Sequence, residues 1–267
     1  MIFCPLVSGS SGNSTYICYK KTKILVDCGR SGKHIENCLR QIGVDIHDIN
    51  AILITHSHTD HTQSAIILSK RYDIPIYASV GTWREMSRKF DATNMKSQNI
   101  RLFQSSSTLL PIDLGDFEAQ FFAIPHDTAE PVGYRFTNGK MNVAIATDIG
   151  HITPTLRKNL FGAKLVLLES NHDVQKLLDG PYTQRLKKRI LGDYGHLSND
   201  NAGLFSVELI QNGTERIYLG HLSQENNSPE IAWRTVSNVL KNHQLDGKKD
   251  AEIFLTRRDE PSRISQY

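Results

Sequence analysis

Short hydrophobic runs recur along the chain, and they predict many short strands separated by helices. Apolar or alternating runs of about four to eight residues are typical of strands, whereas apolar positions repeated every three or four residues favour helices. Strands are expected at residues 2–7, 15–19, 23–27, 51–55, 74–78, 100–104, 117–124, 132–136, 142–147, 164–169, 215–219 and 253–256. Helices are expected at residues 33–42, 62–72, 82–90, 154–160, 184–191, 201–211 and 229–242.

The order of these elements predicts an α/β protein with two halves of similar make-up. Strands are followed by alternating strand and helix units, and the same order then repeats without a recognisable sequence repeat. Two mixed sheets that face each other, with helices outside, would fit this order. Because we find no linker or low-complexity tract, we expect a single domain over residues 1–267. The polar tail after Arg257 is expected to fray.

Composition and charge narrow the class of protein only moderately. Hydrophobic residues make up 39% and charged residues 22% of the 267 residues, which argues against disorder. The net charge of +3 permits a polyanionic partner without requiring one. The four cysteines form no CxxC pair and the first residues lack a secretory signal. We therefore expect a cytoplasmic protein with reduced thiols, no membrane partner and no obligate protein partner.

The strongest chemical signal is the run HSHTDH at residues 56–61, directly after an apolar strand. Crowded imidazoles and a carboxylate are costly to place at a strand end unless each finds a partner. His56 and His58 are two residues apart and can point the same way, which suits one metal ion. Asp60 and His61 follow the turn and can face a second ion. This donor set suits Zn²⁺, Mn²⁺ or Fe.

Further ligands are expected where other apolar strands end. His126 follows residues 121–125, Asp148 follows residues 143–147, and His221 follows residues 217–220. A lone histidine or aspartate at a strand end is more often a hydrogen-bonding residue than a ligand. In this order after an HxHxDH run, however, the three together indicate a metal site.

On these residues the chain resembles the metallo-β-lactamase superfamily over nearly its whole length. The resemblance implies a four-layer αβ/βα sandwich that holds two divalent metal ions. It implies that the first ion is held by His56, His58 and His126, the second by Asp60, His61 and His221, with Asp148 as the bridge. Zinc β-lactamases of the classical type carry a cysteine at the Asp148 position, whereas dinuclear phosphodiesterases and thioesterases carry an aspartate. A two-metal-activated hydroxide is the nucleophile that such a site supplies.

Several other segments resemble one subfamily, the bacterial YycJ (WalJ) group. They include SGSSGNSTY at residues 8–16, HDTAEPVGY at 126–134, ESNHD at 169–173, GHLSN at 195–199 and HLSQENN at 221–227. This resemblance implies a 5′→3′ exonuclease with a nucleic acid substrate, DNA before RNA. Asp60, His172 and His196 are the expected catalytic residues, the histidines as groups that stabilise charge or protonate the leaving oxygen.

Two segments are candidates for substrate binding. The loop that contains Ser8, Ser10 and Asn13 is a hairpin turn whose backbone could also form a nest for a terminal phosphate. Lys187 and Arg189 belong to a basic helix that could hold a nucleic-acid backbone, although such helices are more often solvated faces. Asp27, after the strand at 23–27, is expected to support a ligand histidine or to cap a turn.

Other functions remain open at this point. A dinuclear hydrolase of a small cyclic phosphodiester would use the same ligands, and an RNA-processing nuclease is a further alternative. A thioesterase is disfavoured because nothing resembles its C-terminal substrate domain. A catalytically silent regulatory protein is disfavoured because all seven ligand positions are present.

Overall fold

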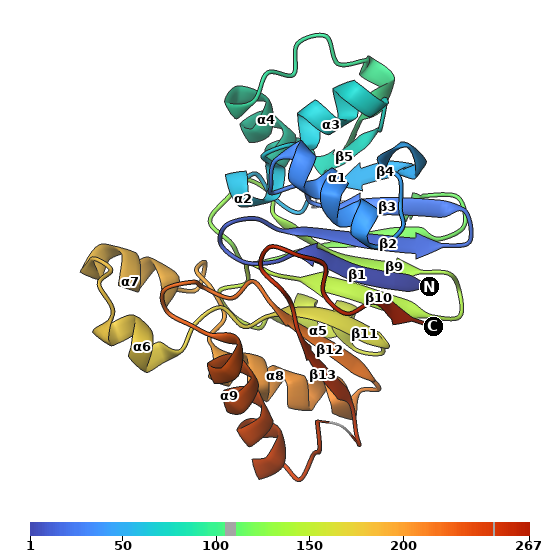
Figure 1. Ribbon diagram of the computed structural model, residues 1–267. Helices are drawn as coiled ribbons and strands as arrows, with labels where there is room; N and C mark the ends of the chain where they lie inside the picture. The colour runs from blue at the N-terminus through green and yellow to red at the C-terminus, as the bar shows by residue number, and fades with distance from the viewer. Residues whose placement is uncertain (105–110, 248) are drawn as a thin grey trace. The chain divides into compact units, whose positions relative to one another are not determined.

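The computed structural model describes residues 1–104, 111–247 and 249–267 (Figure 1). The chain forms two compact units. Unit 1 comprises Met1–Phe121, Thr128–Val132 and Thr256–Tyr267, and unit 2 comprises Phe122–Asp127 and Gly133–Leu255. That residues 1–267 form a single domain stays a prediction. No helix of the described ranges is long and apolar enough to cross a membrane.

Unit 1 is built on a seven-stranded sheet of order β14-β1-β2-β3-β4-β5-β6. Its strands are β1 (Ile2–Val7), β2 (Ser14–Tyr19), β3 (Thr22–Val26), β4 (Ala51–Leu53), β5 (Ile76–Ser79), β6 (Ile100–Phe103) and β14 (Ser265–Gln266). Its helices are α1 (Gly32–Gln41), α2 (Thr59–Thr62), α3 (Ala65–Tyr72) and α4 (Val80–Lys89), with short 3₁₀ turns η1 (Ile46–Asp48) and η2 (Ser97–Asn99). Strands β3 to β6 run parallel, so their carboxyl ends share one edge of the sheet.

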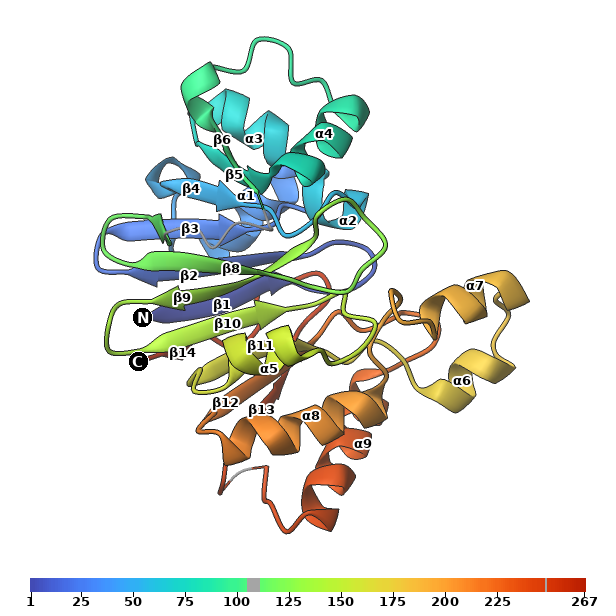
Figure 2. The same ribbon diagram turned by 180° about the vertical axis from the view of Figure 1, so that it is seen from behind.

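The second sheet has the order β13-β12-β11-β10-β9-β8-β7. Its strands are β7 (Ile112–Asp113), β8 (Glu118–Ala123), β9 (Val132–Thr137), β10 (Asn142–Ala146), β11 (Leu165–Glu169), β12 (Arg216–Gly220) and β13 (Glu252–Leu255), and β8 enters unit 2 after Phe121. The helices of unit 2 are α5 (Pro154–Leu160), α6 (Val174–Asp179), α7 (Gln184–Ile190), α8 (Asn199–Gln211) and α9 (Pro229–Asn242). Helices α8 and α9 pack together, whereas α6 and α7 stand away from the sheet of their unit in both views (Figures 1 and 2).

Local sequence explains where the helices of unit 2 begin. Thr153 and Ser228 each accept a hydrogen bond from the third residue of the helix that follows, and each is followed by proline at the first helical position. Such a cap contributes about 1 kcal/mol. The strands β10, β11 and β12 are buried along almost their whole length, as expected for parallel strands covered on both faces.

The predicted strands are present, and three details differ from the sequence prediction. The helix expected at 62–72 begins only at Ala65 as α3, and a separate short helix, α2, ends at Thr62. The break lies at Ser64, whose amide and hydroxyl both donate to the carbonyl of Cys28. The short elements α6, β7 and β14 were not predicted. The expectation that the tail frays is wrong, because β14 pairs with β1 through Phe3 and Ser265, and Ser265 is buried.

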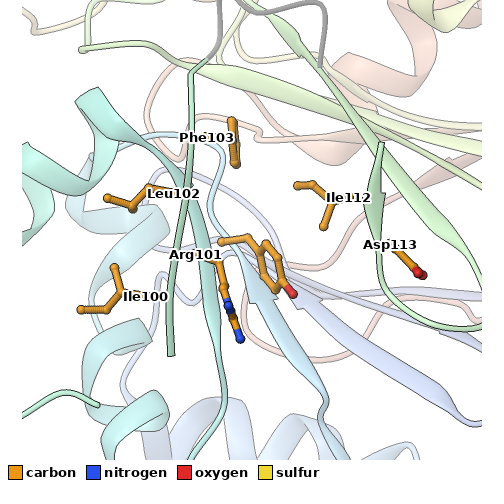
Figure 3. Close-up of a pocket in the computed structure, with 7 residues that line it drawn as sticks. Ile100, Arg101, Leu102, Phe103, Ile112 and Asp113 are labelled. Carbon is orange, nitrogen blue, oxygen red and sulfur yellow. The ribbon is translucent and has the colours of Figure 1, made fainter. Parts of the chain in front are cut away.

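A pocket of about 510 Å³ lies in unit 1, lined by Tyr77, Ile112, Asp113 and residues 100–103 of β6 (Figure 3). None of the predicted metal ligands lines it. Its walls combine apolar side chains with Arg101 and Asp113, and they do not carry the chemistry that the sequence predicts.

The contact between α8 and α9 generates a stability prediction. A Cβ on Gly203 would lie 2.9 Å from both Cβ and Cγ2 of Val239. The branched valine has little freedom to move away. Gly203→Ala is therefore expected to lower the free energy of unfolding by about 1–3 kcal/mol, although alanine is favoured over glycine in helices by about 1 kcal/mol. Urea denaturation measures the change.

The same replacement in a Val239→Gly background provides the control. Removing the whole valine side chain, Cβ included, makes room for the new Cβ, so Gly203→Ala should there be neutral or stabilising. Equal destabilisation in both backgrounds would contradict this packing contact.

Candidate metal centre

The HSHTDH run follows β4 in unit 1, and Asp27 fixes its position. Asp27 comes directly after β3, the parallel neighbour of β4, so the two strand ends meet. Its carboxylate accepts hydrogen bonds from the amide of Thr55, the hydroxyl of Thr55 and Nδ1 of His61, each at 2.8 Å. Because Nδ1 of His61 carries the donated proton, its Nε2 is left as the nitrogen with a lone pair. Asp27 thus supports a histidine of the run, as the sequence predicted.

Two imidazoles of the run converge in a way that suits a metal ion. Nε2 of His56 lies 3.2 Å from Nδ1 of His58. A tetrahedral ion with metal–nitrogen bonds of about 2.0–2.1 Å separates two ligand nitrogens by about 3.3 Å. Both rings belong to unit 1, and His56 is fully buried. The spacing therefore fits a pair of ligands to one ion.

Helix α4 holds the residue between these two histidines. Ser57 is buried, and its hydroxyl donates a hydrogen bond to the carboxylate of Glu85. Nζ of Lys89 donates to the carbonyl of Ser57 at 2.9 Å. The sequence prediction missed this support, because nothing in the spacing of Glu85 and Lys89 from residue 57 signals a contact.

The Ser8–Asn13 loop, for which the sequence allows a hairpin turn or a phosphate nest, is held by hydrogen bonds within the protein. The amides of Ser8, Gly9, Gly12 and Asn13 all donate to acceptors within the protein. The buried side chain of Asn13 lies 3.0 Å from Nε2 of His61. Of the three residues of this loop that were predicted to bind substrate, Ser8 and Asn13 are buried and Ser10 is exposed. These bonds use four amides of the loop, and the phosphate-binding role of Ser8, Ser10 and Asn13 stays a prediction.

Three acidic or imidazole side chains of unit 2 gather where β10, β11 and β12 end. Glu169 is the last residue of β11, His221 follows β12, and Asp148 follows β10 by two residues. These strands are parallel neighbours, and such strands lie about 4.8 Å apart. Ligand atoms of Asp148, Glu169, His196 and His221 all lie within 4.8 Å of one another. The strand order therefore assembles a four-residue group that could hold a metal ion.

Glu169 organises this group and was not among the predicted site residues. It is fully buried, and its Oε1 accepts hydrogen bonds from Nδ1 of both His196 and His221 at 2.8 Å. Its Oε2 accepts from the amides of Ile149 and Leu197. Burial alone would raise the pKa of Glu169, but His196 and His221 outweigh it and lower that pKa to about 2. The sequence signal that could have identified Glu169 is a charged residue at the end of the apolar strand β11.

His126 completes the imidazoles of unit 2. Its Nδ1 lies 3.3 Å from the carbonyl oxygen of Gly195, and its Nε2 lies 3.8 Å from Oδ1 of Asp148. Burial lowers the pKa of His126, which favours the neutral form that binds metal. Oδ1 of Asp148 also lies 3.5 Å from Nδ1 of His221 and 3.7 Å from Nδ1 of His196. Asp148 is thus central among three imidazoles.

Backbone conformation also marks these positions. Asp27, Asp148 and His221 have φ angles of 63°, 57° and 55°. Left-handed backbone is uncommon for residues other than glycine and costs about 1–3 kcal/mol. Each of the three stands at or near the end of a strand, Asp27 beside the HSHTDH run of unit 1 and Asp148 and His221 in the acidic and imidazole group of unit 2. The rest of the fold must therefore hold these turns in place.

The four remaining predicted residues have different surroundings. His196 belongs to the four-residue group of Asp148, Glu169, His196 and His221. His172 is only 1% exposed and neither ring nitrogen has a hydrogen-bond partner among the described residues, so its predicted contact with substrate is not supported. Lys187 is 7% exposed and its Nζ donates to the carbonyl of Leu178 at 2.5 Å, which gives it a structural use. Arg189 forms a bidentate ion pair with Asp127.

The predicted metal ligands therefore fall into two sets. His56, His58, Asp60 and His61 lie in unit 1, and His126, Asp148 and His221 lie in unit 2. In unit 1, Oδ2 of Asp60 lies 3.6 Å from Nε2 of His61. Each unit brings its own members together, and the donors are the imidazoles and carboxylates that divalent transition metals take.

Comparison with known proteins shows what this chain is similar to. Residues 22–221 match the β-lactamase superfamily domain. The chain is 37% identical over 265 residues to exodeoxyribonuclease YycJ of Bacillus anthracis, covering 99% of this chain and 98% of the relative. It is also 37% identical to exodeoxyribonuclease WalJ of Streptococcus pneumoniae, with 98% and 96% of the two chains covered.

Solved structures support the fold. The metallo-β-lactamase fold protein YhfI from Bacillus subtilis superposes with a TM-score of 0.70 at 15% identity, covering 99% of this chain and 98% of the other. A diphosphatase of the PhnP family superposes with a TM-score of 0.65 at 20% identity, covering 100% and 98%. The predicted fold class, with two mixed sheets flanked by helices, is therefore confirmed.

The burial of His172 generates a prediction for stability against pH. Burial lowers the pKa of His172 from 6.5 to about 4. The unfolded chain therefore takes up a proton below about pH 6.5 that the folded chain takes up only near pH 4. Neutral His172 therefore adds fully to the free energy of unfolding above about pH 6.5. This stabilisation is lost as the pH falls toward about 4. In EDTA, wild type should lose up to about 3 kcal/mol more over this window than His172→Phe.

Urea denaturation across this pH window measures the difference. His243→Gln is the control, because His243 is an exposed histidine of the same unit, and its replacement should keep the wild-type slope. His172→Gln serves as a second variant if the phenylalanine does not fit. A wild-type slope in both His172 variants would contradict the prediction.

Proposed function

The chain belongs to the metallo-β-lactamase superfamily, and from that membership we propose that it is a metal-dependent phosphodiesterase acting as a 5′→3′ exonuclease on DNA. The observation that carries the hydrolase assignment is the position of Asp148 among His126, His196 and His221. The DNA substrate is supported by the two relatives named exodeoxyribonucleases, which this chain matches over nearly its full length. Direction and strand end follow from the resemblance of the whole sequence to that group.

Two divalent ions are part of this proposal. We assign His56, His58 and His126 to one ion, Asp60, His61 and His221 to the other, and Asp148 to both. The support is the convergence of His56 and His58 in one unit and of Asp148 with three imidazoles in the other. Bound there, the ions would polarise the phosphoryl oxygens and supply a nucleophilic hydroxide at neutral pH. Mn²⁺, Zn²⁺ and Fe all suit this donor set, with Mn²⁺ the first choice for DNA.

The protein's own groups set the geometry and manage protons. Glu169 accepts a hydrogen bond from Nδ1 of His221 and so leaves its Nε2 as the nitrogen available to an ion. The same carboxylate accepts from Nδ1 of His196, whose ring is partly exposed. In its doubly protonated form, His196 would carry a second proton on Nε2 and could donate it to the leaving 3′-oxygen. Asp27 fixes the tautomer of His61 in the same manner.

The cellular setting in this proposal is the cytoplasm. Cys4, Cys18, Cys28 and Cys38 are all free and buried. Free thiols fit a reducing compartment, in which a nuclease of this kind would meet DNA.

The two-ion assignment predicts the effect of removing the bridge. Asp148→Ala should lower turnover by more than about 100-fold, since loss of a residue that only supports a ligand already costs about 10–100-fold. The assay follows 5′-phosphorylated duplex DNA labelled at its 3′ end, with Mn²⁺, Mg²⁺ or Zn²⁺ added to metal-stripped protein. Elemental analysis should find fewer bound ions in the variant.

Asp179→Ala is the matched control, because Asp179 is an exposed carboxylate of the same unit. It should keep both activity and metal. Full activity in Asp148→Ala would overturn the two-ion assignment. Failure of wild type to cleave DNA with any ion would overturn the exonuclease proposal and favour a small phosphodiester substrate.

Adjacent lysines of α7 predict how DNA binding depends on salt. Lys188 is exposed, whereas the ammonium of Lys187 is buried against Leu178. Lys188→Ala should reduce the slope of log affinity against log salt by about 0.7–0.9 if it loses one phosphate contact. Lys187→Ala should keep the slope and lower the free energy of unfolding. Fluorescence anisotropy in EDTA, at several salt concentrations, measures the slope for each variant, and urea denaturation measures the free energy of unfolding. A reduced slope in Lys187→Ala with an unchanged slope in Lys188→Ala would contradict this assignment.

A further inference from the structure

One aromatic side chain near the proposed centre is exposed without an obvious structural reason. Tyr194 lies in the turn between α7 and α8 and is 63% exposed, the highest value for a large hydrophobic side chain within the described ranges. Single exposed hydrophobic residues are common and need no explanation. The surroundings of Tyr194 are what make it informative.

The backbone on both sides of Tyr194 is tightly held. A Cβ on Gly150 would lie 2.1 Å from the carbonyl oxygen of Asp193 and 2.7 Å from the amide nitrogen of Tyr194, so the two loops touch. A Cβ on Gly195 would lie 2.2 Å from the carbonyl oxygen of Ile190. Nδ1 of His151 lies 2.9 Å from the carbonyl oxygen of Asp193. Tyr194 is therefore an exposed ring on a fixed backbone, which keeps the entropic cost of a contact low.

The fixed turn is also part of the proposed centre. The carbonyl of Gly195, one residue after Tyr194, lies 3.3 Å from Nδ1 of His126. His196, two residues after it, bonds to Glu169. Successive Cα atoms are about 3.8 Å apart, so the Cα atoms of Tyr194 and His196 lie within about 7.6 Å. A tyrosine at this distance can reach a nucleotide next to the reacting phosphate.

Charges around the ring indicate which part of a nucleotide it would meet. Arg185 and Lys188 of α7 are exposed and can attract the phosphate backbone. Asp193, next to Tyr194, is also exposed and would repel a phosphate placed directly over the turn. A neutral, flat nucleobase is the part of DNA that suits the ring. Base stacking on aromatic side chains, flanked by cations that follow the backbone, is how many proteins hold single strands.

We propose that Tyr194 is a binding residue that stacks on a nucleobase adjacent to the scissile phosphate. This inference rests on the proposed exonuclease function and adds a specific contact to it. Stacking is tolerant of base identity because every base has a π-face. Tyr194 would therefore strengthen binding of the frayed end of any DNA sequence, and the aromatic ring, not the hydroxyl, would be the required group.

The test removes the ring and the base separately. Tyr194→Ala and wild type are compared on 5′-phosphorylated DNA and on the same DNA with an abasic site moved through the terminal nucleotides. On intact DNA, Tyr194→Ala should raise KM about 5- to 100-fold and leave kcat nearly unchanged. At one abasic position, wild type should lose the same factor and the variant should lose nothing further. Tyr194→Phe and Tyr194→Trp should retain the wild-type KM.

Trp233→Ala is the control for loss of an exposed aromatic ring, since Trp233 lies on α9 of the same unit. Thermal unfolding of each variant checks that the fold is intact. An unchanged KM in Tyr194→Ala, or equal additional losses from the abasic site in wild type and variant, would overturn the stacking inference while leaving the nuclease proposal intact. If wild type neither binds nor cleaves DNA, the proposed function fails, and the inference that rests on it fails with it.

Discussion

The buried carboxylate of Glu169 is the constraint on which the chemistry of unit 2 depends. A charge removed from water at the end of an apolar strand is strongly destabilising unless it is fully hydrogen-bonded. Glu169 meets this condition through two backbone amides and the rings of His196 and His221. Because each of these bonds also orients its donor, satisfying the carboxylate fixes the two histidines. The same four hydrogen bonds therefore stabilise the buried charge at the strand end and set the geometry of the site.

Unit 1 solves the same problem with a different residue. Asp27 directly follows β3, whereas Glu169 is the last residue of β11. Asp27 accepts hydrogen bonds from His61 and from the amide and hydroxyl of Thr55. Burial raises the pKa of Asp27, and the interactions with His61 and Thr55 oppose that rise. In both units a carboxylate behind the histidines sets their tautomers. The sequence thus indicated the candidate ligands, and the structure shows how the carboxylates of Asp27 and Glu169 orient them.

The turns that carry this chemistry are conformationally demanding. Asp27, Asp148 and His221 adopt left-handed backbone, and Gly150 and Gly195 allow neighbouring loops to approach closely. The cost of these turns is offset by the buried parallel strands that precede them. The exposed ring of Tyr194 lies instead on the turn between α7 and α8, which Gly150 allows to approach the loop after β10 closely. Rigid strand ends thus position the proposed ligands, and this close approach holds the turn that carries the proposed contact to a nucleobase.

The sequence by itself determined the strands, the fold class and the candidate ligands, because apolar runs and the HSHTDH spacing are local patterns that one chain segment carries. It could not show that Glu169 joins His196 to His221, or that Glu85 reaches Ser57, since these pairs are brought together by strand order and helix packing. Tertiary structure also decided exposure. Lys187 and Lys188 are alike in sequence, yet only the second faces solvent, because burial depends on what packs against each face of a helix.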